Sequence, residues 1–513
     1  MASPQEKLAQ SLERLRRLQG EDRAGAIRSR DLQRGDRERL LKLGFIQEVM
    51  KGWYISSPVD DTRGESTAWY ASFWKFCRVY LSERFDEDWS LSPEQSLSIH
   101  TGNWSVPAQL LVRSSKAGNK IIKLPHETSL LDVRAKLPGP RDVSIEDGLR
   151  LFSLESALIA AKPTFFKNPV TDAQAALAMI KDPSPLLERL LDGNHSRIAG
   201  RLTGAFRSIG RDRIADDILA AMAAAGFTVR ESNPFDDKVQ VSLPRRDTLP
   251  HVVRMRLLWQ KMRDPVIESF PASPESPISS KRYLEAVKNV YASDAYHSLS
   301  IEGYCVSADL IERVRSGEWN PESNEEDRNH RDALAARGYH LAFQAVRESL
   351  EKVLKGTDPG DVAENDHSSW YRELFAPSVP AGLLRPSDLA GYRREQVFIR
   401  GSMHVPMKAV AVADSMAAFF DLLREEENSA VRVVLGHFFF VNIHPYMDGN
   451  GRIGRFLMNV MMAAGGYPWT VIPVQKRDVY KDALKDASVR QNITPLAEFL
   501  GSLVNTTAPE PSN

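Results

Sequence analysis

Residues 444–455, HPYMDGNGRIGR, bring an imidazole, a carboxylate, a carboxamide, two guanidinium groups and three glycines into twelve positions. Glycine backbones can aim successive N–H groups at one point, and the apolar run 456–464 predicts a helix whose positive end adds its field to theirs. Arginines three residues apart offer two guanidinium forks that suit phosphate oxygens. We therefore predict a site for a di- or triphosphate with these donors: Gly449, Asn450, Gly451, Arg452 and Arg455.

Two further residues of the motif, Asp448 and His444, predict a bound metal cation and a general base beside this anion site. A carboxylate beside phosphates repels them unless a cation intervenes, and magnesium commonly binds between a carboxylate and substrate phosphates, so Asp448 predicts a metal. His444 is the one group of the motif whose ordinary pKa, about 6.5, lets it take a proton near neutral pH. Pro445 stiffens the turn that presents it. Phosphate donors, a metal and a base together indicate phosphoryl or nucleotidyl transfer.

The same glycines fit two other patterns less well. The spacing Gly449-x-Gly451-x-x-Gly454 matches the dinucleotide-binding fingerprint, but that fingerprint needs a preceding strand, and IHPYMD at 443–448 argues against one. A purely structural turn would not explain the histidine, the aspartate, the asparagine and two arginines. The sequence contains no G-x-x-x-x-G-K-[ST], which excludes a P-loop as far as sequence allows.

His437 precedes the motif by seven residues in an apolar run. Metal binding by His437 and His444 would need a third ligand that we do not find in the sequence. We therefore interpret His437 as a histidine of the hydrophobic core.

Helical patterns must position the motif. Apolar residues recur at helical spacing in 281–303, 332–356, 415–428, 430–443 and 454–466. One segment differs, because residues 394–410, REQVFIRGSMHVPMKAV, carry β-type residues on both sides of Gly401 and predict a hairpin. Proline and serine accumulate at 268–282, and we place the main domain boundary there.

The front half predicts two further regions. In residues 1–58, leucines 8, 12, 15 and 18 predict a helix, residues 27–43 predict two more short helices ending at Gly44, and 45–55 predict a hairpin. This is the order of a winged helix. Residues 1–51 hold 12 Lys and Arg against 8 Asp and Glu, so both DNA binding and a small helical protein-contact domain stay open. Residues 59–268 mix helical and alternating patterns and predict an α+β region.

Composition bounds the class of protein. A chain of 513 residues predicts two or three domains, and a net charge of zero gives no global field toward nucleic acid or membrane. Cys77 and Cys305 fit neither a disulfide framework nor a zinc site. The N-terminus lacks an apolar signal core, and no run approaches the length that spans a bilayer. We expect a cytoplasmic protein without membrane contact.

The motif HPYMDGNGRIGR resembles the core motif of the Fic family, H-P-F-x-[DE]-G-N-G-R-x-x-R, with tyrosine at the aromatic position. The resemblance extends over about 281–505 and implies a mainly α fold: an all-helical domain with a β-hairpin flap at VFIRGSMHVPMK. It implies ATP and magnesium as cofactors and AMP transfer to a Ser, Thr or Tyr hydroxyl of a target protein. By that resemblance His444 is the base, Asp448 holds the metal, and the glycines, Asn450 and both arginines hold the phosphates. Tyr480 and Asn459 are weaker candidates for the nucleoside pocket.

Ser298-x-x-x-Glu302-Gly303 is similar to the inhibitory motif [ST]-x-x-x-E-[GN] of the same family. It ends the helix predicted near 283–303, where one subclass carries an inhibitory helix. A Glu302 carboxylate paired with Arg455 would deny that arginine to the terminal phosphate. The resemblance therefore implies an enzyme held in check by its own chain.

The front half resembles the antitoxin-like regulators of abortive-infection systems, through GFIQEVMKGWYI and LSPEQSLSIHTGN. This favours a bacterial origin and leaves a DNA-binding regulator, with the Fic half as nucleotide sensor, as an alternative function. A Fic relative that transfers a different phosphate-containing group is a second alternative. Whether the chain forms a homodimer stays open.

Overall fold

A computed structural model describes residues 3–18, 26–57, 66–235, 249–274, 279–318 and 331–507. The chain forms two compact units, Met1–Leu257 with Phe398–Val405, and Leu258–Val397 with Pro406–Asn513. The division at Leu257 lies inside a helix, upstream of the predicted boundary segment. Within the described ranges, none of the helices combines the length and the apolar character that crossing a bilayer requires.

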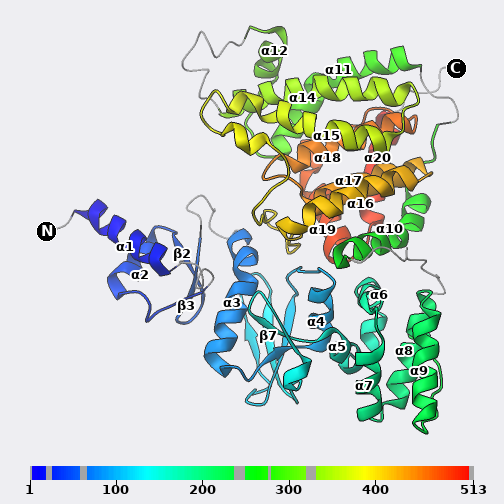
Figure 1. Ribbon diagram of the computed structural model, residues 1–513. Coiled ribbons are helices and arrows are strands. Elements are labelled where there is room, and N and C mark those ends of the chain that lie inside the picture. The colour runs from blue at the N-terminus through cyan, green and yellow to red at the C-terminus, as the bar shows by residue number, and fades with distance from the viewer. Residues whose placement is uncertain are drawn as a thin grey trace. The chain divides into compact units, whose positions relative to one another are not determined.

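The first unit begins with two helices around a small sheet (Figure 1). The three strands are antiparallel in the order β1-β3-β2, and the predicted hairpin is confirmed as β2 and β3. The elements are α1 (Pro4–Leu18), β1 (Ile27–Arg28), α2 (Arg34–Lys42), β2 (Ile46–Met50) and β3 (Trp53–Ser56).

One of the two short helices predicted within residues 27–43 is wrong. Ile27 pairs with Tyr54 in the sheet, and the Asp31 carboxylate accepts the Arg28 backbone N–H at 3.0 Å, which closes a turn after the strand. An aspartate that bonds a nearby backbone N–H favours turns over helices. Long-range pairing and turn chemistry therefore outweigh the local helical pattern.

The arginines of this N-terminal region are largely paired with carboxylates. Arg34 bonds Glu38 at 2.8 Å, and Arg28 bonds Asp31 at 3.0 Å. Three more pairs follow the same rule: Arg14 with Asp36, Arg30 with Glu83, and Arg39 with Asp36. The basic surplus is thus partly neutralised within the unit, and a nucleic-acid phosphate would compete with these carboxylates.

The rest of the first unit is a mixed sheet flanked by α3 and followed by helices (Figure 1). The strand order is β4-β5-β7-β6, and β5 and β7 run parallel in register. Aromatic residues of α3, including Trp69 and Phe73, are fully buried in its core. The elements are α3 (Thr67–Phe85), β4 (Ser90–Leu91), α4 (Pro93–His100), β5 (Gln109–Ser114), β6 (Ile121–Lys123), β7 (Ser129–Arg134), β8 (Val143–Glu146) and β9 (Leu149–Phe152).

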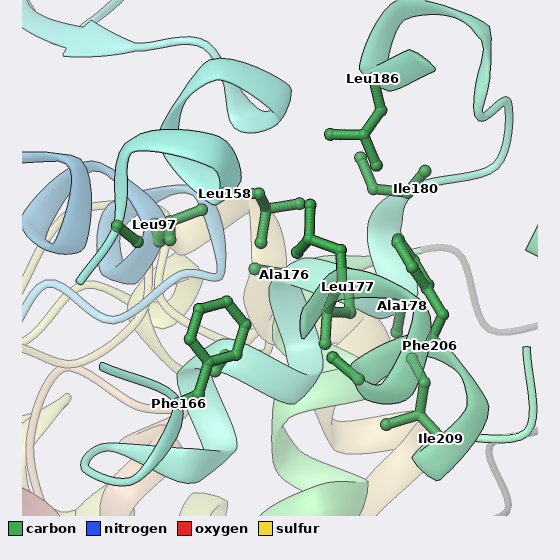
Figure 2. Close-up of a cluster of buried hydrophobic side chains, with 14 of the residues drawn as sticks. Leu97, Leu158, Phe166, Ala176, Leu177, Ala178, Ile180, Leu186, Phe206 and Ile209 are labelled. Carbon is green, nitrogen blue, oxygen red and sulfur yellow. The ribbon is translucent and has the colours of Figure 1, made fainter. Parts of the chain in front are cut away.

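Five helices complete this unit around their own apolar cluster (Figure 2). Leu158, Phe166, Leu177 and Phe206 reach the cluster from different elements and are fully buried. The helices are α5 (Leu154–Ala160), α6 (Val170–Met179), α7 (Ser184–Asp192), α8 (Ser196–Ser208) and α9 (Asp212–Ala224).

The described residues of the second unit form helices and no strand, which confirms the mainly α prediction for this half. Apolar residues cover most faces of the two central helices, α17 and α18, so that both are buried along most of their length. The helices are α10 (Pro250–Ser269), which begins in the first unit, α11 (Ser280–Ile301), α12 (Ala308–Ser316), α14 (Arg331–Leu354), α15 (Pro359–Phe375), α16 (Val412–Glu425), α17 (Ser429–Ile443), α18 (Asn450–Ala464), α19 (Arg477–Val489) and α20 (Thr494–Thr507).

The predicted hairpin at 394–410 has its turn but not its strands. Gly401 adopts a φ of 71°, and Ser402 N donates to Ile399 O at 3.0 Å. No strand is assigned to these residues. The Met403 carbonyl instead accepts the Val106 N–H at 2.8 Å, and Pro406 has no N–H to offer a ladder.

Candidate active site

A six-residue loop between α17 and α18 carries the catalytic candidates. His444 ends α17 in the left-handed conformation, with a φ of 55°, and Gly449 precedes α18 with a φ of 80°. The Asn450 carboxamide closes the loop, because its Oδ1 accepts the Tyr446 N–H at 2.9 Å and its Nδ2 donates to Tyr446 O at 2.8 Å. The Asn450 side chain thus braces the loop through one bond at each end of its amide, and its contact with a phosphate stays a prediction.

His444 has the protonation state that a base requires. Its Nδ1 lies 3.2 Å from Val441 O, and only a protonated nitrogen can bond a carbonyl, so Nε2 carries the lone pair. Burial lowers the pKa of His444 to about 4. The charge of Arg393 lowers it further, whereas the bond to Val441 and the charges of Glu302 and Asp448 oppose the shift. The imidazole is neutral at pH 7.

Arg455 holds the two residues of the predicted inhibitory motif. Its Nε donates to Ser298 Oγ at 2.8 Å, and its Nη2 donates to Ser298 O at 3.0 Å and to Glu302 Oε1 at 2.8 Å. The Arg455 side chain is 5% exposed and that of Glu302 is 33% exposed. Burial opposes the charge of Glu302, but Arg455 and Arg452 outweigh it and hold the pKa of this carboxyl below its ordinary value.

Gly451 lets the Glu302 carboxylate reach the first turn of α18. A Cβ at Gly451 would lie 2.3 Å from Glu302 Oε1, so any side chain at this position would displace the carboxylate. The positive end of a helix and a guanidinium both favour an anion. A carboxylate of the same chain therefore lies where the phosphate site is predicted, and phosphate binding there stays a prediction.

Arg452 lies between two aromatic rings. Its guanidinium carbon is 5.1 Å from the ring centroid of Tyr304 and 5.1 Å from that of Phe375, and the residue is 1% exposed. Gly303, with a φ of 88°, reverses the chain after Glu302, so that Tyr304 N bonds Leu299 O at 3.1 Å. The segment that carries Glu302 thus contacts both arginines of the motif, and sequence reasoning missed the contact of Tyr304.

Asp448 lies at the edge of the loop with 66% of its side chain exposed. Its Oδ1 accepts the Gly449 N–H at 2.6 Å, and its Oδ2 lies 3.4 Å from Arg452 Nη2. The described residues contain no group of three or more metal-binding side chains. One exposed carboxylate beside an anion site still fits magnesium, because this ion keeps several waters and takes its other ligands from phosphates.

Three further side chains that the sequence singled out form hydrogen bonds inside the second unit. His437 is fully buried, donates from Nδ1 to Gly454 O at 2.9 Å and accepts the Tyr480 hydroxyl at Nε2 at 2.7 Å, which confirms the core interpretation. The Asn459 amide accepts the Thr470 N–H at 2.7 Å and donates to Thr470 O at 3.1 Å. The side chains of Asn459 and Tyr480 are thus hydrogen-bonded inside the unit, and their part in a nucleoside pocket stays a prediction.

Known proteins resemble the region around this site. Residues 362–462 match the sequence model of the Fic/DOC family. The protein adenylyltransferase Fic of Drosophila willistoni is 30% identical over 226 residues, which are 43% of this chain and 42% of that protein, and the Drosophila virilis protein of the same name is 30% identical over 43% of this chain and 43% of its own length. The chain thus spans less than half the length of these curated relatives. A solved structure of Fic-1 from C. elegans is 18% identical, covering 66% of this chain and 96% of that one with a TM-score of 0.36.

Proposed function

We propose that the second unit is a protein adenylyltransferase that transfers AMP from Mg-ATP to a Ser, Thr or Tyr hydroxyl of a target protein. The observation that carries the proposal is the Glu302 carboxylate on Arg455 and against Gly451, because it marks an anion site beside a neutral histidine. The match to the Fic/DOC family over 362–462 supports the same reaction class.

In the proposed reaction His444 transfers the proton and Arg455 binds the terminal phosphate. His444 Nε2 takes the proton of the target hydroxyl, the hydroxyl oxygen attacks the α-phosphorus, and the bond to the β-phosphate breaks, so that pyrophosphate leaves. Arg455 and the first turn of α18 hold the terminal phosphate. Magnesium held by Asp448 would neutralise charge on the phosphates.

Glu302 restrains this reaction by occupying the place of a phosphate. While its carboxylate bonds Arg455, that guanidinium is not free for the terminal phosphate of ATP. A 100-fold restraint corresponds to about 2.7 kcal/mol, which one partly buried charge pair can supply.

Transfer of label from ATP identifies the reaction. Wild-type, Glu302→Gly and His444→Ala proteins are incubated with magnesium and ATP labelled at either the α- or the γ-phosphate, alone and with a cell lysate. The proposal predicts α-label on protein, strongest with Glu302→Gly and absent with His444→Ala. Transfer of γ-label would instead identify a kinase-like relative, and transfer that survives His444→Ala would remove the base from the mechanism.

The paired arginines of the N-terminal region give no support to the DNA-binding alternative. If no label transfers from any variant, salt-dependent and site-selective DNA binding becomes the next measurement.

A further inference from the structure

Arg393 is a buried arginine outside the motif that contacts the loop of the catalytic base. It is 4% exposed, and its Nε donates to His444 O at 2.8 Å. Its backbone N–H donates to Pro445 O at 2.9 Å. The side chain and the main chain of Arg393 therefore hold two consecutive carbonyls at the start of the α17–α18 loop.

The same guanidinium reaches both arms of the segment 394–410. Its Nη1 donates to Glu395 O at 3.0 Å, before the turn, and its Nη2 donates to Met407 O at 2.5 Å, after the turn. Gln396 adds a second tie between the arms, from Nε2 to Pro406 O at 2.8 Å. Side chains thus close the base of a segment that lacks a strand ladder.

The partners of Arg393 are unusual for a buried charge. Buried arginines are normally paired with carboxylates, but no carboxylate among the described residues forms an ion pair with Arg393. Burial lowers the pKa of its guanidinium to about 10, so the group stays charged at neutral pH. An uncompensated cation therefore lies next to His444.

If Arg393 only held the chain in place, its hydrogen bonds would suffice and its positive charge would not be needed. The charge of Arg393 disfavours the His444 imidazolium, whereas the charges of Glu302 and Asp448 favour it. Arg393 thus counteracts two carboxylates that would otherwise help to protonate the base.

We propose that Arg393 is a positioning residue for AMP transfer, which locks the loop that carries His444 to both arms of the segment 394–410. Its charge also keeps the imidazole in the neutral form that accepts a proton. The inference rests on the proposed function, because it requires His444 to act as the base.

Two substitutions of Arg393 separate position from charge. Arg393→Lys keeps the cation but cannot reach three carbonyls with a planar fork, and Arg393→Met removes both. Arg394→Met is the matched control, since Arg394 is the next residue and is exposed. All are made in the Glu302→Gly background, and the rate of self-labelling with α-labelled Mg-ATP is followed from pH 4 to pH 8, together with ATP affinity and thermal unfolding.

We expect the labelling rate to fall about 100-fold in both Arg393 variants, as a shift of a catalytic group by about 1 Å can cause, with ATP affinity changed less than threefold. In Arg393→Met the acid limb of the pH profile should also move to higher pH, because the cation that lowers the pKa of His444 is gone. Arg393→Lys should keep the acid limb in place. A folded Arg393→Met protein with the rate and acid limb of the Arg394→Met control would overturn the proposal.

The titration of His444 by NMR tests Arg393 without activity, with the resonance assigned from His444→Ala. The pKa of His444 should rise in Arg393→Met and stay in place in Arg393→Lys and Arg394→Met. If the Glu302→Gly parent labels nothing, the proposed function fails, and this titration still decides the electrostatic half of the inference. An unchanged pKa in Arg393→Met would refute it.

Discussion

Arginine is used differently in the two units of the molecule. In the N-terminal region, Arg34 pairs with Glu38 at the surface, where such pairs contribute little to stability. In the second unit Arg393, Arg452 and Arg455 are buried and contact carbonyls, aromatic rings or the Glu302 carboxylate. The count of arginines therefore says little about function, whereas burial and the nature of the partner set apart the arginines to which we assign a part in the proposed reaction.

The largest difference between the buried arginines of the second unit and the exposed Arg34 is expected when Arg455→Ala is compared with Arg34→Ala. Removing Arg455 leaves the Glu302 carboxylate without its partner and removes the proposed phosphate ligand, so AMP transfer should be lost and the free energy of unfolding should fall by about 3 kcal/mol. Arg34→Ala should change neither, because its pair with Glu38 is exposed. Label transfer and chemical denaturation measure both. Normal transfer by Arg455→Ala would show that the buried arginine is no phosphate ligand.

Removing the carboxylate partners of Arg455 and Arg34 should have equally different effects on the rate of AMP transfer. Glu302→Ala should raise AMP transfer about 100-fold, equivalent to about 2.7 kcal/mol, because Arg455 becomes free for phosphate. Glu38→Ala removes the partner of an exposed arginine and should leave the rate unchanged. Initial rates with α-labelled ATP compare the two, and equal rates in both variants would mean that Glu302 exerts no restraint.

Burial should also give His437 a pH-dependent effect on stability. Its pKa is lowered to about 4 by burial, against about 6.5 in the unfolded chain. Below pH 6.5 the unfolded chain takes up a proton that the folded chain refuses, so stability falls by about 1.4 kcal/mol per pH unit, or about 2 kcal/mol between pH 6.5 and 5. The free energy of unfolding is measured by denaturation at pH 8, 6.5 and 5. It should not change through His437 above pH 6.5, and between pH 6.5 and 5 it should fall less in His437→Gln than in the wild type. The same acid loss in both proteins would contradict this.

The smallest effect on stability is expected from the aromatic ring of Tyr304 that lies over Arg452. Tyr304→Leu removes the cation–π contact with Arg452 and should lower the free energy of unfolding by about 1 kcal/mol. Tyr304→Phe keeps the ring and should match the wild type. Denaturation of the three proteins measures the difference, and equal losses in both variants would show that the hydroxyl, not the ring, matters.

The helices were predictable because their signals are local. Apolar spacing predicted α17 and α18, and the brief motif around Ser298 and Glu302 predicted the contact with Arg455 that the structure shows. Family resemblance supplied that pairing, since 153 positions separate the two charged residues.

The failures share a cause, which is pairing between distant segments. Ile27 joins a strand because Tyr54 is available, and the arms of 394–410 form no ladder while Val106 takes one carbonyl. Arg393 and Arg394 are the same residue type side by side, yet the first is buried on the loop of the base and the second is exposed. No local pattern distinguishes them, so the role that we propose for Arg393 could be inferred only from the structure.

The intact mass of the Glu302→Gly protein after incubation with Mg-ATP tests the central claim most directly, with Glu302→Gly/His444→Ala as the control. The account predicts the mass of one or more AMP groups on the first protein and none on the second. An unmodified Glu302→Gly protein that also leaves every lysate protein unlabelled, or equal modification of both variants, would contradict a histidine-based adenylyl transfer restrained by Glu302.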